Sequence, residues 1–134
     1  MIALDTNVLV RLLLKDDPAQ HAAAEKLLAQ PRDYAVSVTV MLELVWVLES
    51  VGFDTAEVAH AITSIIAQPN IYVHQADAVA AANAHYRVGA DFADALHHAL
   101  CATPKHTAFA TFDKKFADFA KRRKLQPSVA PIGA

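Results

Sequence analysis

The chain has 134 residues, of which 54% are hydrophobic and 19% are charged. This length suits one compact domain spanning residues 1–134, and the apolar content excludes an intrinsically disordered chain. The single cysteine, Cys101, excludes both an internal disulfide framework and a zinc site built of cysteines. No apolar run reaches the roughly 20 residues of a membrane span and no secretory signal is visible, so we expect a cytoplasmic protein.

The net charge of −2 conceals an uneven distribution along the chain. Residues 105–124 hold seven Lys or Arg against two Asp, whereas residues 1–104 hold five basic against twelve acidic groups. A basic segment on an acidic body indicates a phosphate-rich partner such as a nucleic acid. A solvated helix face is the alternative that charge alone leaves open.

Strand-like and helix-like segments alternate along the whole chain. We expect strands at 2–4, 34–38, 71–73 and 107–111, with a last edge strand near residue 129. We expect helices at 8–14, 18–30, 39–48, 55–67, 77–87, 91–101 and 112–124. The residues expected to cap or open these helices are Asp17, Ser37 or Thr39, Thr55, Asp77 and Asp91. The alternation predicts an α/β domain, a three-layer α/β/α sandwich with a mostly parallel central sheet.

Two aspartates follow predicted strands directly. Asp5 comes after the first strand, and Asp113 follows strand 107–111 with one residue between. In open parallel sheets, ligands bind beyond the carboxyl ends of the strands, so both side chains are expected at one edge if these strands are parallel. Taken singly, each could also be an ordinary loop or turn residue.

Three further carboxylates add to this pattern. Glu43 interrupts the apolar run 40–48, where an isolated buried carboxylate is costly, so we expect it to be paired or functional. Asp91 and Asp94 stand three residues apart at a helix start and face the same way, although Asp91 alone suits a helix cap. Converging carboxylates repel one another unless a cation neutralises them. Oxygen ligands without cysteine favour Mg²⁺ or Mn²⁺, a device of phosphodiester hydrolysis.

Four short motifs, in this order along the chain, resemble those of the PIN-domain ribonucleases. They are Leu-Asp-Thr-Asn-Val-Leu at 4–9, the segment 39–46 around Glu43, Asp-Phe-Ala-Asp-Ala-Leu at 91–96, and Thr-Phe-Asp-Lys-Lys-Phe at 111–116. The order, the spacing and the chain length are similar to those of VapC toxins of bacterial type II toxin–antitoxin modules. The resemblance covers nearly the whole chain.

This resemblance implies a metal-dependent endoribonuclease. The implied metal ligands, for Mg²⁺ or Mn²⁺, are Asp5, Glu43, Asp94 and Asp113, with Asp5 and Asp94 as the principal ones. The implied supporting residues are Asn7, Asp91 and Thr111. The implied partners are an RNA substrate such as tRNA, a cognate antitoxin that covers the acidic groove, and a second copy in a homodimer.

The basic segment fits the same interpretation. Lys114 and Lys115 follow Asp113 and are expected to contact substrate phosphates, with the run 121–124 extending that contact. Phe109, Phe112, Phe116 and Phe119 are expected in the core. In the pair His97–His98, His98 lies one helical turn beyond Asp94, which leaves open a role at the site or a partly exposed position.

Two other function classes remain open from the sequence. A phosphatase of the haloacid-dehalogenase type needs a nucleophilic Asp and a second Asp two residues later, where this chain has Asn7. A non-catalytic RNA- or protein-binding domain has no need of clustered carboxylates.

Overall fold

In the computed structural model, which describes residues 1–133, short strands alternate with longer helices. The strands are β1 (Ile2–Ala3), β2 (Tyr34–Val36), β3 (Ile71–Val73), β4 (Ala108–Thr111) and β5 (Ser128–Pro131). The helices are α1 (Thr6–Leu14), α2 (Pro18–Leu28), α3 (Val38–Ser50), α4 (Thr55–Ala67), α5 (Ala76–Arg87), α6 (Phe92–Leu100) and α7 (Lys114–Arg122). All strand pairs are parallel, so the expected α/β class is confirmed, consistent with a three-layer α/β/α fold.

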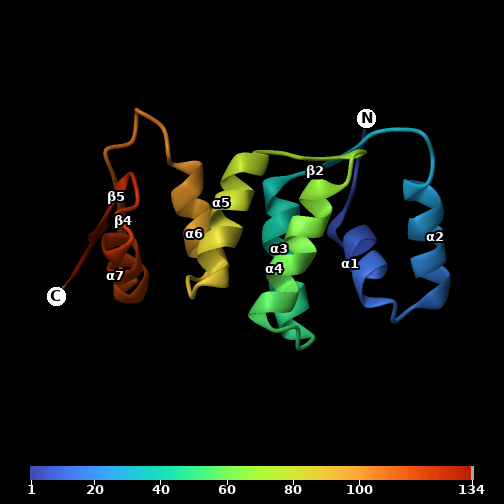
Figure 1. Cartoon of the computed structure of the whole chain (residues 1–134), viewed down its shortest axis with the longest axis horizontal. Helices are drawn as coiled ribbons and strands as arrows, with labels where there is room; N and C mark the ends of the chain where they lie inside the picture. The colour runs from blue at the N-terminus through green and yellow to red at the C-terminus, as the bar shows by residue number, and fades with distance from the viewer. Residues whose placement is uncertain (134) are drawn as a thin grey trace.

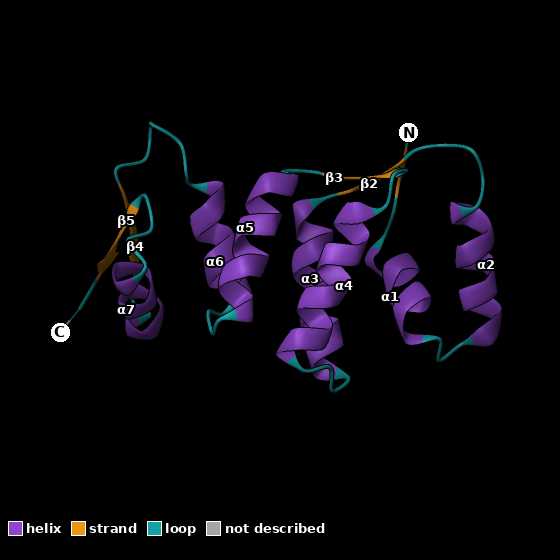
Figure 2. Cartoon of the chain, in the orientation of Figure 1, coloured by secondary structure: helices purple, strands orange, loops and turns teal. Residues whose placement is uncertain are grey.

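The described strands form two separate parallel sheets. One has the order β1-β2-β3 and the other pairs β4 with β5. Figure 1 shows the β4–β5 pair and α7 at one end of an elongated molecule, with β1, α1 and α2 toward the other end. In Figure 2 the helices α3 to α6 occupy the space between the two groups of strands.

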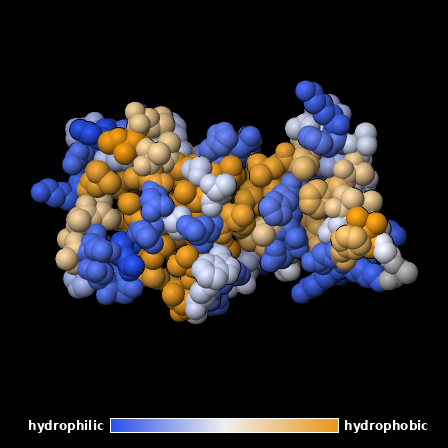
Figure 3. Space-filling model, turned by 180° about the vertical axis from the view of Figure 1, so that it is seen from behind, coloured by the Kyte–Doolittle hydropathy of each residue, from blue (hydrophilic) through white to orange (hydrophobic). Residues whose placement is uncertain are grey.

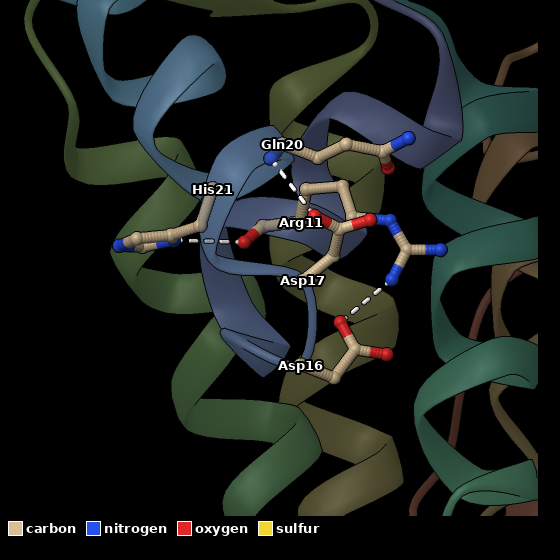
Figure 4. Close-up of polar contacts among 5 residues, drawn as sticks. All are labelled: Arg11, Asp16, Asp17, Gln20 and His21. Carbon is tan, nitrogen blue, oxygen red and sulfur yellow. Dashed lines mark hydrogen bonds and ion pairs between the residues drawn. The ribbon is translucent and has the colours of Figure 1, made fainter.

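The junction between α1 and α2 shows how the sequence sets a helix boundary. The Asp17 carboxylate accepts a hydrogen bond from the Gln20 amide at 3.1 Å, which caps α2 as predicted. Arg11 forms an ion pair with Asp16 at 2.6 Å, and His21 Nδ1 donates to the Arg11 carbonyl at 2.8 Å (Figure 4). These contacts fix the turn between the two helices.

Two predicted helix starts need correction. Helix α4 begins at Thr55, but Asp54 caps it in a full capping box with Glu57, which the sequence interpretation missed. Asp77 was predicted to cap α5, and this is wrong: the helix begins at Ala76, after Gln75 in the left-handed region at φ 55°. The tight link from β3 leaves no extended residue at which an Asp side chain could cap the helix.

The core has two parts with different side chains. Large aliphatic and aromatic residues fill the part between β2, α3 and α4. Its fully buried members include Tyr34, Met41, Leu44, Leu48 and Ile62. Aromatic rings dominate the part around α7, where Phe116 and Phe119 are buried and stack at 6.4 Å between ring centroids.

Phe112 was expected in the core, and this is wrong: it is 77% exposed. It lies in the turn before Asp113, which caps α7, so it is outside the helical face that Phe116 and Phe119 share. Across residues 1–133, no helix has both the length and the apolar character needed to cross a membrane.

Candidate functional site

A pocket of about 320 Å³ between α6 and α7 gathers three of the predicted acidic residues. Asp91, Asp94 and Asp113 line it, together with the cationic side chains of Lys115 and Arg122. Chain segments more than 20 residues apart in sequence therefore meet here, as the motif pattern predicted for Asp94 and Asp113.

Helix capping positions these carboxylates. Asp91 caps α6 by accepting a hydrogen bond from the Asp94 amide at 3.0 Å, and Asp113 caps α7 by accepting one from the Phe116 amide at 3.0 Å. The Asp113 amide in turn donates to Thr111 Oγ1 at 3.0 Å, which fixes the turn after β4. Two helix N-termini thus face the same pocket, and their dipoles favour negative charge there.

The Asp94 and Asp113 side chains influence each other's protonation in opposite directions. Burial, followed by the negative charges of Asp91 and Asp113, raises the pKa of Asp94 to about 6. The hydrogen bond from the Phe116 amide, helped by contacts with Asp94 and Lys115, lowers the pKa of Asp113. Asp94 is therefore the carboxylate of this pocket that most needs a neighbouring positive charge.

Glu43 lies in an adjoining groove of about 410 Å³ between α3 and the start of α6. Asp91 lines both this groove and the acidic pocket. Glu43 itself is exposed, although the apolar run around it suggested burial. The periodicity of α3 explains this, because Met41, Leu44 and their helical neighbours face the core while Glu43 turns outward.

Trp46 and Glu49 belong to the same groove, which the sequence interpretation did not identify as part of the site. Trp46 is 67% exposed, and Glu49 accepts a hydrogen bond from the Tyr86 hydroxyl at 2.9 Å. The signal was available, because Leu42, Trp46 and Glu49 recur at the i, i+4, i+7 spacing of one helix face.

Asp5 stands apart from the other acidic residues. It follows β1 as the N-cap of α1, is exposed, and makes no capping hydrogen bond with its side chain. Asn7 lies beside it, on a groove between α1 and α2 that Arg11 also lines. The expected meeting of Asp5 and Asp113 at one sheet edge is wrong for this chain arrangement, because β1 and β4 belong to different sheets at separate places in the molecule (Figure 1).

No three carboxylate, imidazole or thiol groups in the described part of the chain are close enough together to hold one metal ion. The structure therefore brings Asp94 and Asp113 together, places Glu43 in the neighbouring groove, and leaves out Asp5.

Basic side chains continue from the acidic pocket along α7. Lys115, Lys121 and Arg122 line a shallow groove of about 410 Å³, with Asp118 between them. Lys114 is exposed nearby. The Arg123 guanidinium instead lies over the Phe119 ring, 4.8 Å from its centroid, so it supports the packing of α7.

The two histidines of α6 have roles that the sequence interpretation did not foresee. His98 is buried, and its Nε2 donates a hydrogen bond to the Pro127 carbonyl at 2.6 Å. It also makes edge contacts with Phe109 and Phe116, so both open interpretations of His98 were wrong. His97, three residues after Asp94, is the one whose charge acts on the Asp94 pKa, where it has a small lowering influence.

A comparison with protein families adds an independent finding. The profile of the PIN domain matches residues 2–122, which includes all four acidic motifs. The comparison with curated proteins finds no match.

Proposed function

Since the chain belongs to the PIN domain family, whose members are generally nucleases, we propose that it is a metal-dependent endoribonuclease and the toxin of a type II toxin–antitoxin module. The observation that carries the proposal is the pocket in which Asp91, Asp94 and Asp113 meet beside Lys115 and Arg122. Carboxylates next to cations suit a site that holds a divalent ion and a phosphate together.

The residues present fit a hard divalent cation. All predicted ligands offer carboxylate oxygens, which suit Mg²⁺ or Mn²⁺. The pKa of Asp94, raised to about 6, shows a carboxylate whose charge is poorly compensated, as expected where a cation belongs. We assign Asp94 and Asp113 as ligands, with Asp5 and Glu43 completing the set. Such an ion activates water and neutralises charge on the scissile phosphate.

The protein side chains have separate roles in this proposal. Lys115 and Arg122 bind the phosphates on either side of the scissile bond, and Lys114 extends that contact. Asp91 and Thr111 position the carboxylates through the hydrogen bonds that fix the starts of α6 and α7. Asn7 has the corresponding supporting role for Asp5.

The partners follow from the same site. The substrate is RNA, with tRNA as the first candidate, and the active form is a homodimer in the cytoplasm. A cognate antitoxin inhibits the enzyme by covering the acidic pocket and the groove beside Trp46, whose large exposed ring suits a protein contact.

An RNA cleavage assay tests the nuclease proposal. The full-length protein should cut tRNA with Mg²⁺ or Mn²⁺ and lose that activity in EDTA. Asp94→Asn should lower the rate by at least about 100-fold, because it removes a metal-ligating charge and keeps the side-chain shape. Asp77→Asn is the matched control, since Asp77 is exposed in the first turn of α5, outside the pocket.

Undiminished cleavage in EDTA, or by Asp94→Asn, contradicts the proposal. Hydrolysis of a phosphomonoester such as p-nitrophenyl phosphate, without cleavage of RNA, favours the phosphatase instead. RNA binding that needs no metal and leads to no cleavage favours the non-catalytic domain. Growth arrest on expression, relieved by Asp94→Asn, tests the toxin assignment separately.

A further inference from the structure

Two parallel strands in this chain have an open edge. Strand β1 pairs only with β2, and β4 pairs only with β5. The Ile2 and Leu4 amides donate to carbonyls on the β2 side, at 3.1 and 2.8 Å, so the peptide groups of Ala3 face away from β2. The Thr111 carbonyl accepts from the Ile132 amide on the β5 side, so the peptide groups of Ala110 face the open edge of β4.

Neither edge carries the features that normally prevent pairing. Natural edge strands are protected by charges, prolines or bulges, whereas β1 and β4 present Ile2, Ala3, Ala108 and Ala110, all exposed. The β1-β2-β3 sheet also has an uncovered face, where Ala3, Ala35 and Tyr72 are in register and Tyr72 is 52% exposed. Parallel sheets are normally covered on both faces. Figure 3 shows apolar residues reaching the surface over the middle of the molecule's other side.

The chain's own β4 is held away from its β1. Only residues 74–75 connect β3 to α5, and α5 is fixed to α4 by hydrogen bonds from Asn83 to the Ala59 carbonyl at 3.0 Å and from Arg87 to Thr63 at 3.1 Å. On the other side, His98 holds Pro127 at 2.6 Å, which fixes the β4–β5 pair to α6. Joining β4 to β1 within one chain would break the α4–α5 packing.

The charges of the two parts suit contact between different copies. Residues 1–75 hold four Lys or Arg against nine Asp or Glu, a net charge of −5. Residues 76–133 hold eight basic against five acidic groups, a net charge of +3. The part that bears β1 and the part that bears β4 therefore attract each other when they come from two molecules.

We propose that two copies of this chain exchange strands, with β4 of one copy pairing in parallel with β1 of the other. Each joined sheet then has the order β3-β2-β1 from one copy and β4-β5 from the second. Because Asp5 and Asp113 both follow the carboxyl ends of their strands, parallel pairing brings Asp5 of one copy to Asp94 and Asp113 of the other. The catalytic meaning of this composite site rests on the proposed nuclease function.

The assembly is tested first by its mass and by blocking one edge. Light scattering on the full chain should give twice the chain mass of 14.5 kDa. Ala110→Pro removes an amide that faces the open edge of β4, so it should give a folded monomer. The matched control is Ala19→Pro, at an exposed position in the first turn of α2 whose amide has no helical partner. A monomeric native chain, or an unchanged Ala110→Pro dimer with native circular dichroism, overturns the proposal.

Mixing two inactive variants tests the composite site. In a dimer of Asp5→Ala with Asp94→Ala, one site carries both substitutions and the other carries neither. Random mixing after mild unfolding and refolding should therefore restore about one quarter of the wild-type rate, since half of the dimers are mixed and each has one intact site. If each site belongs to one chain, the mixture stays inactive, which overturns the exchange.

The two proposals fail in different ways. An active, metal-dependent wild type whose variants do not complement each other contradicts the exchange and leaves the nuclease function intact. A wild type without nuclease activity that forms a dimer sensitive to Ala110→Pro contradicts the function and supports the exchange.

Discussion

Residues 1–75 and residues 76–133, here called the three-stranded unit and the two-stranded unit, are stabilised differently. The three-stranded unit buries aliphatic side chains from β2, α3 and α4, such as Leu44 and Ile62, with no exposed surface. The two-stranded unit relies on small residues between α5 and α6 and on aromatic contacts around His98. It also carries the acidic pocket and most of the basic charge.

This difference separates stability from chemistry. Aliphatic packing is close to a maximum in the unit that holds few candidate site residues, while the unit with the acidic pocket contains uncompensated carboxylates and a buried polar side chain. Charged groups that repel one another reduce stability, so the two-stranded unit is expected to open first. The following experiments measure that contrast.

The largest effect is expected in the aliphatic core. Leu44→Ala should lower the free energy of unfolding by about 3 kcal/mol, because it removes a fully buried side chain and leaves a cavity. Urea denaturation followed by circular dichroism measures the change. Leu42→Ala, on the half-buried side of the same helix, is the control and should cost clearly less. Equal losses for the two would contradict the assignment of Leu44 to the main core.

A smaller and local effect is expected at His98. His98→Ala should cost about 2 kcal/mol, since it leaves the buried Pro127 carbonyl without a donor and removes two ring contacts. Hydrogen exchange should speed up in β4, β5 and α7 but not in β2 or α3. His97→Ala, exposed on the same helix, should leave these rates unchanged. Faster exchange throughout the chain would show that the two units unfold together.

The capping box of α4 should contribute less than either core. Asp54→Ala removes the acceptor for the Glu57 amide at 2.7 Å and should cost about 1 kcal/mol. Thermal unfolding measures it, with Thr55→Ala as the neighbouring control. A loss no larger than that of the control would mean that solvent replaces the cap at no cost.

The mildest expected effect is a pH dependence of the two-stranded unit. Burial first, then the charges of Arg123 and His98, lowers the pKa of His85, whose ring packs edge-on against Phe119. The unfolded chain therefore binds a proton more readily, so stability should fall as the pH drops below 6.5 and level off below the folded-state pKa. His85→Gln should flatten this slope in thermal unfolding between pH 7 and pH 5. An unchanged slope would assign the pH dependence to other groups.

Much of the local structure was predictable from the sequence. Caps such as Asp17, Ser37 and Asp91 were identified correctly, because a capping side chain acts on amides two or three residues away. Asp77 was misplaced because the left-handed conformation of Gln75 is imposed by the short link to β3. The motif order predicted that Asp94 and Asp113 share a site, and the pocket between α6 and α7 contains both.

The sequence by itself determined the alternation of strands and helices, the α/β class and the residue types of the acidic motifs, since periodicity and capping are local properties. Only the tertiary structure decided which carboxylates meet. It placed Glu43 on the outer side of α3, buried His98 under aromatic rings, and divided the strands between two sheets. The reason is physical: strand pairing depends on which long-range contacts form, and the α4–α5 contacts hold β4 away from β1 in one chain.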